Sequence, residues 1–214
     1  MGSEMCIRDR SRTCLRPIPT GKVNKSQALI FGLALSVISI YGLYYFSNIL
    51  SALILSFTIF FYVVVYTVWL KRRTPQNIVI GGAAGALPPV IGWTITTGNL
   101  SLEAVSFFLI IFFWTPSHFW ALSLYKAEDY RLAKIPMLPV ISGIQNTKIN
   151  ILVYSLLMLP VLYLPYHIGF AGNLFAIFCL PLTIYYNYIC FDLYKDEKHK
   201  FDILKAKKVF SYSI

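Results

Sequence analysis

The sequence has few charged residues, and acidic residues are especially scarce. Only 13% of the 214 residues are charged, with 9 Asp or Glu against 19 Lys or Arg. Soluble globular domains usually contain about 25% charged residues, so this composition argues against a soluble protein. Because 57% of the residues are hydrophobic and the mean hydropathy is +0.63, we predict an integral membrane protein.

Motifs of the common soluble enzyme classes are also missing. The sequence contains no P-loop, no GxSxG turn, no HExxH zinc motif and no nucleic-acid-binding module. Its 4 cysteines form no CxxC or metal-like spacing, so we assign them no role. The basic side chains that give the net charge of +10 are therefore expected to contact anionic lipid or a phosphorylated substrate, and not nucleic acid.

What the sequence has instead is a series of long apolar segments. Each approaches or reaches the roughly 20 residues that a helix needs to cross a bilayer. We predict an all-α polytopic transmembrane bundle with six spans, at Ala28–Phe46, Ile49–Leu70, Ile78–Thr97, Leu102–Leu124, Asn150–Tyr166 and Gly169–Phe191.

The third span contains residues that predict a kink and close packing. Pro88 and Pro89 interrupt helical hydrogen bonding. Gly81 and Gly85 have the small-xxx-small spacing that lets helix backbones approach each other. We expect this helix to be kinked and centrally packed, either as ordinary tight packing or as the lining of a substrate cavity.

The basic residues predict which ends of the spans lie together. All 19 fall before the first span, after the last, or in alternate connections. The opposite connections contain only Glu103 and His167 as ionisable side chains. Because Lys and Arg are retained on the cytoplasmic side, we predict that both termini are cytoplasmic, or in the matrix of a mitochondrion. Topology and lipid headgroups explain most of these charges.

The fourth span carries a histidine and then breaks into a charged segment, WTPSHFWALSLYKAEDYR. If the helix continued through Asp129, His118, Tyr125 and Asp129 would lie within about 20° of one face, with Trp114 about 40° away. His118 would lie about 10 Å deeper in the membrane than Tyr125. Such a depth suits the reactive end of an organic substrate.

The polar end of this segment suggests a metal and diphosphate site. Asp129 is a candidate Mg²⁺ ligand, because Mg²⁺ prefers carboxylate oxygens together with substrate phosphates. Guanidinium and ammonium groups bind diphosphate oxygens, and those predicted on the same face are Arg12, Arg16, Lys22 and Lys71 to Arg73.

Structural roles are the alternative interpretation of the same residues. A lone histidine near a helix end is more often a packing or hydrogen-bonding residue than a ligand. Glu128 and Asp129 could simply pair with Lys126 or Arg131 on a solvated loop. The sequence alone leaves both interpretations open.

Four motifs follow one another along the chain: RTCLRPIPTG, NIVIGGAAGALPPVIGW, WTPSHFWAL and YKAEDYRLAKIPMLPV. In this combination they resemble the UbiA-type intramembrane prenyltransferases, and in particular the branch that farnesylates heme. The resemblance runs from Arg12 to the C-terminus. It implies a bundle of about nine spans around a cavity that opens to the cytoplasm or the mitochondrial matrix.

The resemblance also implies a reaction and roles for particular residues. A farnesyl group would pass from farnesyl diphosphate to a vinyl group of heme B, and water would supply the hydroxyl of the product, heme O. Asp129 would bind Mg²⁺, Tyr125 would belong to the catalytic site, and His118 and Trp114 would line the heme pocket. The residues implied in diphosphate binding are Arg12, Arg16, Lys71 and Arg72.

The chain departs from the family pattern at both ends. The first aspartate motif and two spans would precede RTCLRP, but residues 1–11 read MGSEMCIRDRS, which we interpret as a non-matching, extraneous leader to a single domain at 12–214. The chain also ends where the family continues into another span. We therefore expect a fragment with six of about nine spans and with little or no turnover of its own.

Two smaller departures from the family pattern lie within the motifs. Ser117 replaces a usual proline, and Lys134 a usual small residue. Ala133, where quinone-type relatives repeat aspartate, favours the heme branch.

We expect the protein to lie in the lipid bilayer of a bacterial inner membrane, with a mitochondrial inner membrane as the alternative. A downstream heme A synthase is a candidate partner. The alternative functions are prenylation of a quinone precursor or other aromatic acceptor, and a non-enzymatic transporter or assembly factor.

Overall fold

The computed structural model describes residues 15–133, 135–196 and 202–214, so Arg12, Lys134 and the leader at 1–11 lie outside it. Every regular element in the described part of the chain is a helix, as predicted. The elements are α2 (Lys25–Phe46), α3 (Ile49–Phe60), the π-helix η1 (Phe61–Leu70), α4 (Asn77–Gly85), α5 (Pro88–Thr97), α6 (Leu102–Tyr125), α7 (Ala127–Leu132), α8 (Leu138–Ile141), α9 (Gly143–His167), α10 (Asn173–Lys195) and α11 (Ile203–Tyr212).

Six helical stretches are long and apolar enough to cross a membrane, which confirms the six predicted spans. The second consists of α3 followed directly by η1, and the third of α4 and α5. The fifth begins at Gly143, well before the predicted Asn150, and the sixth is Asn173–Lys195 instead of Gly169–Phe191. The chain is therefore an integral membrane protein.

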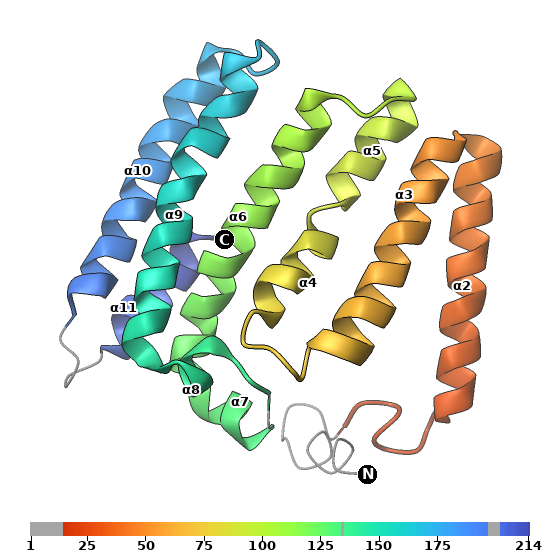
Figure 1. Cartoon of the computed structure of the whole chain (residues 1–214), viewed down its shortest axis with the longest axis horizontal. Coiled ribbons are helices and arrows are strands. Elements are labelled where there is room, and N and C mark those ends of the chain that lie inside the picture. Colours follow the sequence, from red (N-terminus) through yellow and green to blue (C-terminus); the bar gives the residue numbers. More distant parts are fainter. Residues whose placement is uncertain (1–14, 134, 197–201) are drawn as a thin grey trace.

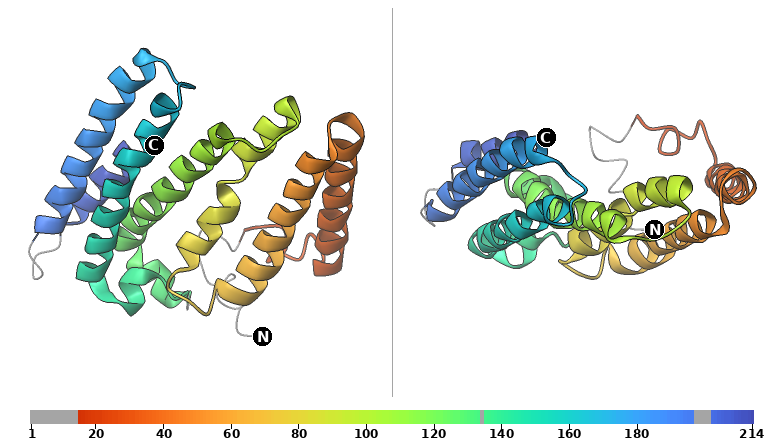
Figure 2. Two further views of the ribbon diagram at one scale, coloured as in Figure 1. Left: turned by 45° about the horizontal axis from the view of Figure 1, so that its top comes forward. Right: turned by 90° about the horizontal axis from the view of Figure 1, so that it is seen from above.

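The spans form a curved row in chain order, and Figure 2 shows this curvature from above. α6 lies at the centre, where it contacts α4 and α5 on one side and α9 on the other. α11 packs against both α6 and α10. The main core is built where these elements meet, around Trp120, Ile151, Tyr186 and Leu193.

The basic connections gather at one end of the bundle, as the charge distribution predicted. The segment before α2, the connection from η1 to α4, and helices α7 and α8 all lie at the lower end in Figure 1. Lys148 was predicted to lie in the connection before the fifth span, but the structure places it elsewhere. Because α9 begins at Gly143, Lys148 lies inside the helix with its side chain fully buried, 3.7 Å from an Asp196 carboxylate oxygen.

The third span is kinked where its sequence predicted. α4 ends at Gly85 and α5 begins at Pro88, so the two prolines start a new helix. The close approach of helix backbones predicted at Gly81 and Gly85 is replaced by contacts with side chains, at Gly81 and its neighbour Gly82. A Cβ atom on Gly81 would lie 2.8 Å from the Tyr66 ring, and one on Gly82 would lie 3.0 Å from Thr115. Gly85 has open space around it.

This difference between the glycines leads to a stability prediction. Gly81→Ala should lower the free energy of unfolding by about 1–3 kcal/mol, because the new methyl group overlaps the Tyr66 ring. Gly85→Ala is the matched control and should be tolerated, since no atom lies within 4 Å of its Cβ position. Thermal unfolding of the two variants in detergent measures both effects. Equal destabilisation would contradict the packing argument.

Candidate functional site

His118 lies on α6 with both faces of its imidazole covered by aromatic rings. The Trp114 ring stacks on one side at a centroid distance of 4.4 Å, and Phe210 of α11 stacks at 4.6 Å. Phe119 meets the imidazole edge-on at 5.0 Å. Only 6% of the residue is exposed. A substrate can therefore approach His118 only at the edge of its ring.

The hydrogen-bond partner of the His118 ring is Ser213, the residue that follows α11. The Ser213 Oγ lies 2.6 Å from His118 Nδ1 and 2.6 Å from the Phe210 carbonyl oxygen. Its single hydroxyl proton can point to only one of these atoms at a time. When it points to Phe210, Nδ1 is the donor; when it points to His118, Nδ1 is the acceptor. The Trp114 Nε1–H donates to the Ser213 carbonyl oxygen at 2.9 Å.

Trp114, His118, Phe119 and Phe210 form an aromatic cluster, and Tyr125 also belongs to it. The prediction that His118 and Tyr125 lie in a stripe on one face of the helix is therefore confirmed within α6. The Tyr125 ring meets Phe210 edge-on at 5.9 Å. The Lys207 ammonium lies 6.0 Å from the centre of the Tyr125 ring. The stripe therefore leads from a buried imidazole to a cation near the basic end.

The condition for one continuous helical face as far as Asp129 is not met, because α6 ends at Tyr125. Lys126 has φ −113° and ψ 17°, outside the helical region, and α7 starts at Ala127. Asp129 therefore belongs to a separate short helix. Glu128 and Asp129 both lie within α7, about 100° apart round its axis, which does not favour their sharing one ion.

Both carboxylates make the exposed ion pairs that the structural alternative predicted. Glu128 accepts from Arg131 at 2.8 Å, and Asp129 lies 3.7 Å from Lys126. The hydrogen bond to Glu128 raises the pKa of Arg131. In the part of the chain that the structure describes, no three His, Cys, Asp or Glu side chains are grouped as a metal site. Asp129 stays a single candidate ligand.

The described candidates for diphosphate binding lie at the same end of the bundle as α7. Arg16 and Arg72 are exposed, and the Lys71 ammonium lies 5.8 Å from the centre of the Tyr66 ring. Buried Asn77 joins two connections there, because its Nδ2 donates to the carbonyl oxygens of Lys71 (3.2 Å) and Pro136 (3.4 Å). The connection that carries Lys71 is thus tied to the one that follows α7.

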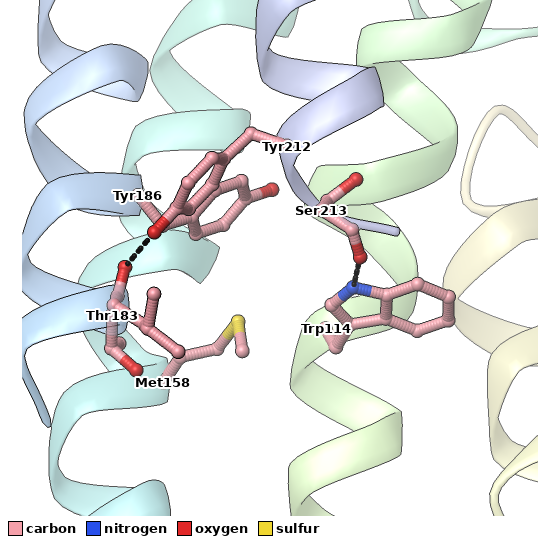
Figure 3. A pocket seen from close by; sticks show the side chains of 7 residues that line it. Trp114, Met158, Thr183, Tyr186, Tyr212 and Ser213 are labelled. Atoms are coloured by element: carbon pink, nitrogen blue, oxygen red, sulfur yellow. Dashed lines mark hydrogen bonds between the residues drawn. The ribbon is translucent and has the colours of Figure 1, made fainter. Parts of the chain in front are cut away.

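A layer of hydroxyl groups lies deeper in the bundle, beside the aromatic cluster. Buried Tyr186 of α10 donates to Ser117 of α6 at 3.0 Å, and Ser117 donates to the Trp114 carbonyl oxygen at 3.0 Å. Ser117, the departure from the family's usual proline, therefore links α6 to α10. Next to this link is a cavity of about 140 Å³, which Figure 3 shows between α6, α9, α10 and α11.

The sequence predictions do not include Phe210 of α11 or Ser213, which follows the helix, because the basic residues of this segment indicate only which side of the membrane it faces. A signal was present: Ala206, Val209, Phe210 and Ser213 recur at the three- and four-residue spacing of one helix face. The contacts of Phe210 and Ser213 with His118 could not be foreseen, since they join residues 92 and 95 positions apart.

The structure combines an apolar bundle that has a basic end with the enclosed imidazole of His118, which lies beneath the carboxylate-bearing helix α7. This arrangement is the one expected of an intramembrane prenyltransferase. The family model of the UbiA prenyltransferases matches residues 7–210. The chain therefore belongs to the UbiA prenyltransferase family.

Curated relatives of this chain carry a more specific name. The protoheme IX farnesyltransferase of Pelagibacter ubique is 69% identical over 95% of this chain and 67% of its own length. Those of Bartonella henselae and Agrobacterium fabrum are 51% and 48% identical over 95% of the chain, and 65% and 64% of their lengths. The chain thus spans about two thirds of the curated relatives it matches. No solved structure matches it.

Proposed function

We propose that this protein transfers the farnesyl group of farnesyl diphosphate to a vinyl group of heme B, giving heme O. The observation that carries the proposal is the 69% identity to a protoheme IX farnesyltransferase along nearly the whole chain. The site supports it, because a buried aromatic cluster for an organic acceptor lies beneath a basic end for a diphosphate. A heme A synthase is a candidate recipient of the product.

At the basic end, Asp129 is proposed to hold Mg²⁺, and Arg12, Arg16, Lys71 and Arg72 to hold the diphosphate. The ion would neutralise charge that accumulates on the departing diphosphate. The basic side chains act by preorganised electrostatics, which lowers the energy of the transition state. Asp129, which now lies 3.7 Å from the Lys126 ammonium, would hold the ion in place of this exposed ion pair.

Deeper in the bundle, Trp114 and His118 are proposed to line the heme pocket. Both faces of the imidazole are covered, so His118 presents its edge to the acceptor and keeps its orientation through Ser213. One face of the Trp114 ring stacks on His118, and its opposite face is proposed to stabilise an allylic cation, an interaction worth about 2 kcal/mol where water is excluded. The stripe along α6 thereby positions the two substrates.

The membrane setting is proposed to be the plasma membrane of a bacterium. Its support is that the three relatives named above come from bacteria. The end that carries the basic connections is proposed to face the cytoplasm, following the positive-inside rule. Reaction with a membrane-impermeant amine reagent in intact and opened cells tests this orientation at Lys71 and Lys126.

The function is tested with the complete gene product in membranes, supplied with heme B, farnesyl diphosphate and Mg²⁺. Farnesylated heme is the expected product, and its absence would overturn the proposal. His118→Ala should weaken heme binding by about tenfold and shift the heme absorption band, because the edge contact is lost. Phe178→Ala on the exposed surface of α10 is the control and should leave the band unchanged. An unaltered spectrum in His118→Ala would instead favour a quinone-type acceptor.

A further inference from the structure

The cavity between α6, α9, α10 and α11 shares a wall with the His118 site. Two of its lining residues contact the imidazole directly: the Trp114 ring stacks on it, and the Ser213 hydroxyl lies 2.6 Å from Nδ1. The cavity has a volume of about 140 Å³, enough for several water molecules. Figure 3 shows its lining side chains, which include Trp114, Met158, Thr183, Tyr186, Tyr212 and Ser213.

The hydrogen-bond donors of this cavity are already engaged. Thr183 donates to the Cys179 carbonyl oxygen at 2.7 Å, and Tyr212 to the Leu182 carbonyl oxygen at 3.1 Å. Tyr186 donates to Ser117, and the Trp114 Nε1–H to the Ser213 carbonyl oxygen. A hydroxyl oxygen that has given away its proton keeps its lone pairs. The lining therefore offers acceptors: the oxygens of Thr183, Tyr186 and Tyr212.

Such a lining determines how a water molecule would be oriented. Water bound to acceptors donates both of its protons to the protein, and its lone pairs then point away from the lining. Donation also increases the electron density on the water oxygen. The cavity is thus suited to hold water as a nucleophile, at a depth where the apolar bundle otherwise excludes water.

The proposed reaction needs a water molecule at this depth. Addition of the farnesyl carbon to the outer carbon of a heme vinyl group leaves a positive charge on the inner carbon, next to the macrocycle. Loss of a proton from that cation would give an alkene, whereas addition of water gives the hydroxyl of heme O. We propose that the cavity lined by Thr183, Tyr186 and Tyr212 holds the water that becomes this hydroxyl group, an inference that rests on the proposed function.

The step balances without an oxidant or reductant. The carbon–oxygen bond of farnesyl diphosphate breaks, and its electron pair leaves with the diphosphate. The vinyl π pair forms the new carbon–carbon bond, and a lone pair of the water forms the carbon–oxygen bond. The resulting oxonium passes one proton to the Ser213 hydroxyl. With that hydroxyl pointing to His118, its own proton passes across 2.6 Å to Nδ1, the acceptor nitrogen in the neutral tautomer that carries its proton on Nε2.

The ratio of two products tests the water site. The complete gene product, supplied with heme B, farnesyl diphosphate and Mg²⁺, is analysed by mass spectrometry for hydroxylated farnesyl heme and for the alkene that is lighter by one water. Thr183→Val removes one acceptor and keeps the shape of the side chain. We expect the ratio of alkene to hydroxylated product to rise about fivefold, the effect of one lost hydrogen bond. Tyr186→Phe should change the ratio in the same direction.

The matched control is Thr115→Val on α6. Thr115 is buried and donates to a carbonyl four residues earlier at 2.7 Å, as Thr183 does, but its side chain faces Gly82. Its product ratio should equal that of the unaltered protein. An unchanged ratio in both Thr183→Val and Tyr186→Phe would overturn the water site, as would an equal rise in Thr115→Val. If the unaltered protein forms neither farnesylated product, the proposed function fails, and the water site with it.

Discussion

Asp129→Asn is expected to reduce farnesyl transfer by the complete gene product by about 100-fold. Asparagine keeps the size of the side chain but removes the charge that binds a hard cation. Loss of one preorganised electrostatic contact to a transition state commonly costs that much in rate. Since Asp129 is exposed and its ion pair with Lys126 lies on the surface, the fold should be unaffected.

The measurement is the turnover rate at saturating heme B and farnesyl diphosphate over a range of Mg²⁺ concentrations. Glu128→Gln is the matched control, because it removes the neighbouring carboxylate of the same helix, which pairs with Arg131 at 2.8 Å. Its rate should stay within about threefold, since exposed ion pairs contribute little. A rate for Asp129→Asn equal to that of Glu128→Gln would refute the proposed metal ligand.

Much of the fold could be predicted because its signals are local. An apolar run of sufficient length indicates a span, and the alternation of basic connections indicates which ends lie together. Pro88 likewise marks the break in the third span, where α5 begins. The start of α9 could not be predicted in this way. Lys148 suggests a helix outside the membrane, but its charge is compensated by Asp196, which lies 48 residues further along the chain.

The site was predictable only where its residues share one helix. His118 and Tyr125 lie on one face of α6 because seven residues make almost two helical turns. Asp129 departs from that face because the backbone leaves the helical region at Lys126, and no proline or glycine marks this break. Phe210 covers His118 because α11 packs against α6, and Tyr186 of α10 reaches Ser117 of α6. These contacts depend on helix packing and were therefore not predictable from local sequence.

An ion-pair network, buried at Lys148 and partly exposed at Lys205, holds α11 in that position. The Lys148 ammonium of α9 donates to the Asp196 carbonyl oxygen at 3.1 Å and lies 3.7 Å from its carboxylate. Lys205 of α11 lies 3.0 Å from Asp192 and 3.9 Å from Asp196. The hydrogen bond to Asp192 raises the pKa of Lys205. The stability this adds is complete below the ordinary lysine pKa and lost as pH rises through the higher value, so it is present at neutral pH.

Asp196→Asn is expected to lower the free energy of unfolding by about 3 kcal/mol. The Lys148 side chain is fully buried and that of Asp196 only 13% exposed, and removing one charge of a buried pair commonly costs this much. The amide keeps an oxygen that can accept from the Asp202 N–H, as the carboxylate does at 2.8 Å, so the change isolates the charge. Thermal unfolding in detergent measures the loss. Arg131→Ala, which breaks an exposed pair, should change stability by no more than about 0.5 kcal/mol.

A double substitution separates the charge from the packing. Lys148→Met combined with Asp196→Asn removes both charges and keeps an apolar side chain of similar length, so most of the lost stability should return. Because the network positions α11, Asp196→Asn should also weaken the contacts of Phe210 and Ser213 with His118. The expected result is weaker heme binding in Asp196→Asn and recovery in the double variant. If the double variant were as unstable as the sum of the two single ones, the charges would not be coupled, and another contact would have to hold α11 in place.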